Sequence, residues 1–168
     1  MDPRVFPVAE IFRLNAWLFH NCLDGLTDAQ AQWRPSPEVN SAAFVAAHVC
    51  ESRVAIAGWL DAPVENPWAA LLANARSIAD TPTLPGLSDV RGTWDRASAA
   101  IARRLAVASP AELDGPAPHG FPVGGPTLLG ALGFLAQHDS YHVGQLALLR
   151  KLAGLPAMTY ASPAAPAV

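Results

Sequence analysis

Basic side chains are scarce in this chain of 168 residues, in which Lys151 is the only lysine among 11 basic residues. The arginines are scattered, the formal net charge at pH 7 is −3, and the isoelectric point is about 5.9. A surface that binds nucleic acid needs clustered lysine and arginine side chains to neutralise phosphates. The composition therefore argues against nucleic acid as a partner.

Charged residues of either sign make up only 15% of the chain, whereas hydrophobic residues make up 51%. An average protein has about 25% charged residues, and disordered chains have more charge and less apolar surface to bury. The length suits one domain of about 100–200 residues. We therefore expect a single folded domain over 1–156, followed by a loosely ordered tail over 157–168 that is rich in alanine and proline.

Cysteine is limited to Cys22 and Cys50, and the N-terminal sequence lacks the basic stretch, apolar core and cleavage site of a signal peptide. These features predict free thiols in a reducing cytoplasm. The longest segment without charged residues, 115–138, is interrupted by prolines and glycines. It leaves too few continuous helical residues to cross about 30 Å of hydrocarbon, so no membrane association is expected.

No segment shows the alternating pattern of a β-strand over a convincing length. Proline and glycine instead separate four long segments with apolar residues at helical spacing, and a short helix could form within 68–79. Expected N-caps are Ser41, Ser88 and Thr127, and Gly154 is the expected C-terminal glycine. The long segments are 7–23, 41–61, 88–108 and 128–153. They predict an all-α fold, a four-helix bundle with long inter-helix loops that leave room for more than the simplest up-down order.

Three of the five histidines lie on helix faces expected to point inward. His138 and His142 are four residues apart on the last predicted helix, which places their Cβ atoms about 5–6 Å apart on one face. His48 lies on the inward face of the helix predicted over 41–61. Three imidazoles from two helices could bind one metal ion and leave coordination positions for water or substrate. From the residues alone, hydrogen-bonded core histidines remain an equal alternative.

The residue after His138 is Asp139. A zinc protease of the H-E-x-x-H type needs glutamate there as its general base, so this class is disfavoured. Asp139 and Glu51 each lie within one helical turn of a candidate ligand. Either carboxylate could support a ligand or transfer a proton, although a surface charge is the simpler interpretation of Glu51.

The segment HDSYHVGQ (138–145), together with Arg150 and Gly-Leu-Pro at 154–156, resembles the closing motif of the DinB-like metal-binding four-helix bundles. Trp-Arg-Pro at 33–35, followed by the single His48, resembles the other signature of that family. The resemblance spans about 33–156, most of the chain. It implies that His48, His138 and His142 bind a divalent metal ion, with zinc or nickel as the expected metal.

The resemblance also suggests a role for two neighbours of His142. Gly144 would permit close helix packing beside the site, because it has no Cβ. Gln145, one turn after His142, could orient a ligand or a metal-bound water, with a solvated helix residue as the equal alternative. Asp139 and Gln145 are therefore the candidate catalytic residues beside the three ligands.

Proteins similar to this one include S-transferases that use a low-molecular-weight thiol such as bacillithiol or mycothiol. The resemblance implies a metal-activated thiolate that attacks a small electrophilic substrate, and arginines at the pocket mouth, Arg53 for example, would favour an anionic thiol. The alternatives are a metal-dependent hydrolase in which Asp139 shuttles the proton, and a non-catalytic, metal-stabilised binding or stress-response module. The apolar fraction exceeds what four helices must bury, which leaves room for a homodimer.

Overall fold

The computed structural model describes residues 1–73, 75, 77–80 and 83–161. All regular elements among these residues are helices, apart from one isolated bridge between Pro116 and Thr127. The predicted all-α class is therefore confirmed. None of the described helices is long and apolar enough to cross a membrane.

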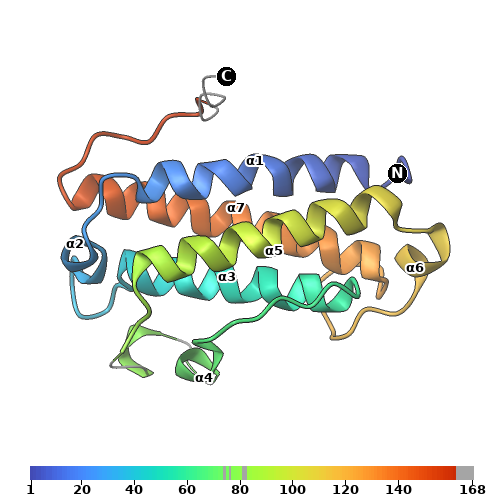
Figure 1. The fold of residues 1–168 in the computed structure, drawn as a ribbon, viewed down its shortest axis with the longest axis horizontal. Coiled ribbons are helices and arrows are strands. Elements are labelled where there is room, and N and C mark those ends of the chain that lie inside the picture. Colours follow the sequence, from blue (N-terminus) through green and yellow to red (C-terminus); the bar gives the residue numbers. More distant parts are fainter. Residues whose placement is uncertain (74, 76, 81–82, 162–168) are drawn as a thin grey trace.

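Four long helices lie lengthwise beside one another (Figure 1). They are α1 (Phe6–Leu23), α3 (Ala42–Trp59), α5 (Leu87–Val107) and α7 (Leu128–Leu152). α1 and α3 each pack against both α5 and α7, so the four helices close a ring in which α1 lies diagonal to α3. The sequence thus folds as the predicted four-helix bundle.

The helix directions depart from the simplest up-down order. α1 and α7 run one way along the bundle, and α3 and α5 run the other way (Figure 1). Because α3 and α5 are parallel neighbours, the chain between them must return along the length of the bundle before α5 can begin. The predicted long connections between helices make this order possible.

Two of the predicted N-caps and the C-terminal glycine are confirmed. The side chain of Ser41 accepts a hydrogen bond from the Phe44 N–H at 3.2 Å, and Thr127 accepts one from the Gly130 N–H at 3.2 Å. Each cap satisfies a backbone donor that a helix leaves unpaired at its start. Gly154 follows α7 with φ of +84°, the left-handed conformation that favours glycine.

The predicted cap of the third long helix, Ser88, is wrong. α5 begins one residue earlier, at Leu87, and the N-cap residue Gly86 has no side chain to accept a hydrogen bond. The Leu87 N–H instead donates to Asp28 Oδ1 at 3.1 Å. The cap therefore comes from another helix, which local sequence patterns cannot reveal.

The short helices were only partly anticipated. The segment 68–79 contains α4 (Ala69–Leu72) and the start of the 3₁₀ turn η1 (Ile78–Asp80) rather than one continuous helix. The helices α2 (Asp28–Gln32) and α6 (Pro110–Asp114) were missed, although both begin with a reciprocal capping box. The capping pairs are Thr27 with Gln30 and Ser109 with Glu112.

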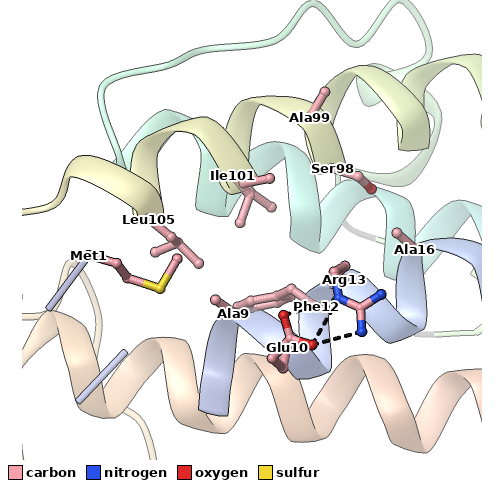
Figure 2. Close-up of a pocket in the computed structure, with 11 residues that line it drawn as sticks. Met1, Ala9, Glu10, Phe12, Arg13, Ala16, Ser98, Ala99, Ile101 and Leu105 are labelled. Atoms are coloured by element: carbon pink, nitrogen blue, oxygen red, sulfur yellow. Dashed lines mark hydrogen bonds and ion pairs between the residues drawn. The ribbon is translucent and has the colours of Figure 1, made fainter. Parts of the chain in front are cut away.

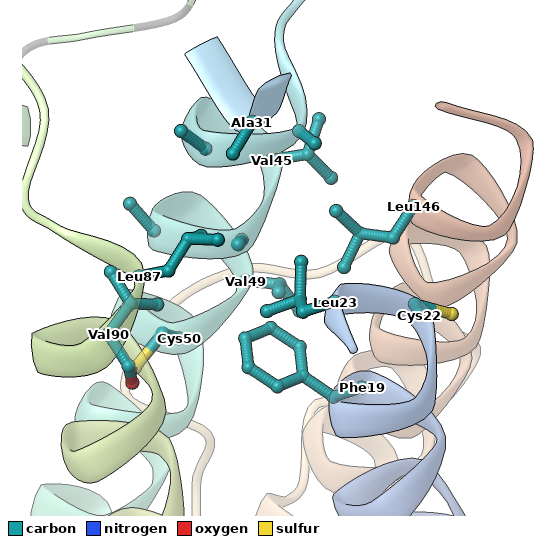
Figure 3. Packing of buried hydrophobic residues seen from close by; sticks show 14 of the residues in the cluster. Phe19, Cys22, Leu23, Ala31, Val45, Val49, Cys50, Leu87, Val90 and Leu146 are labelled. Carbon is teal, nitrogen blue, oxygen red and sulfur yellow. Dashed lines mark hydrogen bonds between the residues drawn. The ribbon is translucent and has the colours of Figure 1, made fainter. Parts of the chain in front are cut away.

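Two apolar clusters fill the bundle, one toward each end. In the first, Phe19, Val49 and Leu146 converge from three different helices (Figure 3). Phe19 also stacks on Trp94 of α5, with ring centroids 4.0 Å apart. Leu132 belongs to the second cluster, nearer the start of α7.

The C-terminal segment keeps contacts with the bundle after α7 ends. The Asn21 side-chain amide donates to the carbonyl oxygens of Thr159 at 2.8 Å and Ala161 at 3.0 Å. The remainder of the predicted tail, 162–168, lies outside the described residues.

Candidate metal centre

Packing of α3 against α7 brings the three predicted histidines together. His138 Nε2 and His142 Nε2 are 3.0 Å apart, as expected for side chains one helical turn from each other. The His48 ring centroid lies 4.8 Å from that of His142 and 5.4 Å from that of His138. One nitrogen from each of the three histidines lies within 4.8 Å of the others, a group that could hold a metal ion.

The surroundings favour the uncharged form of all three imidazoles. Burial is the main cause that lowers the pKa of His48, of His142 and of His138, the last to about 4. Mutual repulsion of the positive charges lowers the pKa of His48 and His138 further. A metal ion binds the neutral imidazole, so the cluster presents its lone pairs in the form that coordination needs.

Gln145 is hydrogen-bonded to His142. Its side-chain Oε1 lies 2.7 Å from His142 Nδ1, and its Nε2 donates to the Tyr141 hydroxyl at 3.1 Å. Because an amide oxygen can only accept, Nδ1 of His142 carries the hydrogen and Nε2 offers its lone pair toward His138. Metal-binding histidines are commonly held in this way. Three neutral nitrogen donors, one of them oriented by an amide, fit a divalent metal ion.

Gly144 does not have the predicted packing role. It is exposed, and a Cβ built on it would meet nothing within 4 Å. The close approach in this helix occurs at Gly130, where a Cβ would lie 2.5 Å from the carbonyl oxygen of Gly125. Gly130 thus allows the preceding loop to pack against the first turn of α7.

Asp139 points into the centre of the bundle. Its side chain is 0% exposed, and its Oδ2 accepts a hydrogen bond from Arg53 Nε at 2.8 Å. Its Oδ1 is buried without a hydrogen-bond partner among the described residues. Burial raises the pKa of Asp139 to about 6, although the Arg53 guanidinium opposes that shift. The role of Asp139 in proton transfer remains a prediction.

Arg53, the example considered for an arginine at the pocket mouth, lies instead in the interior. Besides Asp139, its guanidinium donates to Ser98 Oγ at 2.5 Å and to the Phe12 carbonyl at 2.9 Å. It also lies 3.7 Å from the centroid of the Trp94 ring. Every side of this cation is therefore occupied by the protein itself, and an anionic thiol cannot reach it.

The other two histidines and Glu51 lie apart from the three-histidine cluster. His20 Nε2 is 2.6 Å from an Asp95 carboxylate oxygen, and the His119 ring packs edge-on against Trp59. Glu51 is half-buried on α3, where burial raises its pKa. None of these three belongs to the group that could hold a metal ion.

The second half of the family motif has a structural role that sequence reasoning missed. Arg150 Nε donates to the Pro156 carbonyl at 2.6 Å, and its Nη1 donates to the carbonyl oxygens of Cys22, at 3.5 Å, and Asp24. The guanidinium thus lies at the C-terminal end of α1, where the helix dipole favours a cation. Arg150 joins α7, α1 and the segment after α7.

An apolar pocket of about 320 Å³ lies between α1 and α5 (Figure 2). Phe12 and Leu105 contribute to its walls, and the ion pair of Glu10 with Arg13 lies at its edge. None of the three clustered histidines is among the described residues that line it. It is therefore separate from the candidate metal centre.

Comparison with known proteins identifies the fold and the family. No functionally curated protein matches the chain. A solved structure described as a conserved protein from Enterococcus faecalis superposes with a TM-score of 0.72. It is 14% identical, and the match covers 89% of this chain and 96% of that one, which shows a shared fold. The family model of the DinB superfamily matches residues 12–146, which include the three histidines and Gln145. The chain belongs to the DinB superfamily.

Proposed function

We propose that this protein is a metal-dependent enzyme that transfers a low-molecular-weight thiol to a small electrophile. His48, His138 and His142 would hold a divalent ion. The observation that carries the proposal is their geometry, with three imidazole nitrogens within 4.8 Å on half-buried side chains. Among the described residues the group contains no fourth ligand, which is typical of a reactive site rather than a closed structural one.

A divalent ion at this position would supply positive charge that lowers the pKa of a thiol and polarises an electrophile. Three neutral imidazoles leave that charge uncompensated, whereas carboxylate or thiolate ligands would reduce it. In the transfer, the thiol loses its proton to solvent, and its sulfur forms a bond to the electrophilic carbon. The leaving group departs with the electron pair of the broken bond. Gln145 keeps the His142 ring in place throughout.

Zinc and nickel are the metals we propose, because imidazole is a good ligand for both. The free, buried thiols of Cys22 and Cys50 support a reducing compartment such as the cytoplasm. Burial raises the pKa of Cys22 to about 11 and that of Cys50 to about 12, so neither supplies the reactive thiolate. The reacting thiol is therefore expected to be a separate small molecule.

Elemental analysis of the purified protein tests the metal centre. We expect about one divalent ion per chain, lost in His138→Ala and retained in His20→Ala, whose histidine lies outside the cluster. The metal-loaded protein is then incubated with thiols and small electrophiles, and the S-conjugate is detected by mass spectrometry. A protein that binds neither zinc nor nickel would overturn the metal centre. Turnover of an ester without added thiol, and no S-conjugate, would replace the transferase with a hydrolase.

A further inference from the structure

A second pocket, of about 370 Å³, lies along the last turns of α7, and none of the three histidines is among the described residues that line it. It is formed by the loop that follows α2, the first turn of α3 and the last turns of α7. Gln145 lines this pocket and also holds His142 through the 2.7 Å hydrogen bond to Nδ1. One end of the pocket, here called the Gln145 groove, is therefore a single side chain away from the cluster.

The groove has an apolar lining that is open to solvent. Apart from Glu38, Asn40 and Gln145, its lining side chains are aliphatic. Leu148 is 57% exposed and Leu152 is 50% exposed, although both could have been polar at no cost to the bundle core. Exposed apolar side chains that gather beside a polar site are typical of a binding surface.

The loop wall of the groove is held in shape by Arg34, the arginine of the Trp-Arg-Pro signature. Its Nε donates to the Val39 carbonyl at 2.8 Å, and its Nη2 donates to the Pro37 carbonyl. Ser36 Oγ donates to the Glu38 carboxylate at 2.7 Å. These bonds position Val39 and Glu38 on the wall.

The charge of the groove limits what it can accept. None of the described residues that line it is a lysine or an arginine, and Glu38 is its one ionised side chain. The Arg34 guanidinium, in the same loop, is engaged with the loop carbonyls. An anion in the groove would meet a carboxylate and aliphatic walls, which is unfavourable. The volume is near the lower end of the range of about 300–1,000 Å³ for small-molecule sites.

We infer that the Gln145 groove binds a small, uncharged, largely apolar molecule and directs one end of it toward the three-histidine cluster. The identification of that molecule as the electrophile of the transfer rests on the proposed function. The groove is thus the specificity-determining part of the site, and Leu148 and Val39 select for apolar character.

Fluorescence titration with two probes of the same ring system tests the inference. Phenylnaphthylamine is neutral, and anilinonaphthalene sulfonate is anionic. We expect the neutral probe to bind one site per chain, with a Kd at least about tenfold below that of the anionic probe. Leu148→Glu should raise the Kd of the neutral probe by about tenfold or more. Ala102→Glu, which places the same carboxylate in the α1–α5 pocket of Figure 2, should leave it unchanged.

Four results would overturn the inference. They are binding of neither probe, equal affinity for the two probes, loss of binding in Ala102→Glu but not in Leu148→Glu, and a dimeric wild type that Leu148→Glu turns into a monomer in size-exclusion chromatography. The last result would mean that a second copy of the chain covers the groove. Both substitutions replace exposed helical residues, and circular dichroism checks that each variant is folded.

The metal content of the same samples separates this inference from the proposed function. Leu148 is not a ligand, so Leu148→Glu should keep the metal of the wild type. A metal-free protein that still binds the neutral probe through Leu148 would refute only the metal chemistry. A metal-loaded protein that binds neither probe would refute only the groove.

Discussion

Gln145 makes two hydrogen bonds beside the candidate metal centre. Its amide oxygen faces His142 Nδ1 at 2.7 Å, and its amide nitrogen reaches the Tyr141 hydroxyl at 3.1 Å. This geometry favours the orienting role over that of a solvated helix residue. Because the amide fixes which imidazole nitrogen carries hydrogen, it also decides which nitrogen is free to bind a metal.

Replacing Gln145 by leucine should therefore weaken metal binding without removing a ligand. We expect the affinity for zinc to fall by about tenfold to a hundredfold in Gln145→Leu, measured by competition with a chromophoric chelator. Gln145→Glu keeps an acceptor for His142 Nδ1 and should retain most of the affinity. Gln137→Leu, an exposed position on the same helix, is the matched control. Equal affinity in Gln145→Leu and Gln137→Leu would contradict the orienting role.

Within the helix α7, the side chains near the C-terminal end make different contacts from those in the middle. The middle presents His138 and His142, whereas the end carries Arg150, which reaches carbonyl groups at the end of α1 and after α7. Gly154 then closes the helix, with the Leu155 N–H donating to the Arg150 carbonyl at 3.2 Å. The motif thus contains two candidate metal ligands in its first half and, in its second half, an arginine that joins the ends of α1 and α7.

Loss of the Arg150 side chain should destabilise the fold and leave the metal centre intact. Arg150→Met removes a buried cation that satisfies several carbonyl groups, so we expect the free energy of unfolding to fall by about 2–3 kcal/mol in urea titrations. Lys151→Met, at the exposed neighbouring position, should change it by less than about 0.5 kcal/mol. A similar loss in both variants would show that Arg150 has no special role.

At the scale of the whole molecule, a polar layer divides the core into its two apolar clusters. Each long helix contributes to it between its apolar residues, with Asn15 donating to Ser140 Oγ at 2.9 Å and Arg53 bonded to Asp139 and Ser98. These partners meet in only one register of the four helices. We expect the layer to help specify this register, as buried polar groups do in some bundles.

A substitution in this layer should be severe because it leaves a buried charge without a partner. Arg53→Met exposes the buried Asp139 carboxylate to an apolar core, and we expect a loss of about 3–5 kcal/mol in the unfolding free energy of the metal-free protein. The double variant Arg53→Met/Asp139→Leu removes both charges and should recover most of that loss. The exposed substitution Arg103→Met is the control. A double variant as unstable as Arg53→Met would indicate that packing, not charge, explains the effect.

The sequence by itself determined the features that local geometry controls. The pitch of an α-helix places His138 and His142 on one face wherever the helix lies, and the caps Ser41 and Thr127 act on backbone groups within one turn. His48 lies far away in the chain, and its place on an inward helix face already made it a candidate third ligand. The resemblance was needed to favour a metal site over core histidines, because no local rule pairs one helix with another.

Only the tertiary structure decided which groups meet across helices. It placed Arg53 in the core beside Asp139, capped α5 with Asp28, and set the loop with Arg34 against α7 to form the groove. These contacts depend on how four helices pack and on the order in which the chain visits them, and spacing along the sequence carries little information about either. The histidines that share one helix face could be predicted from the sequence. The contacts between helices and the groove beside Gln145 depend on packing and could not.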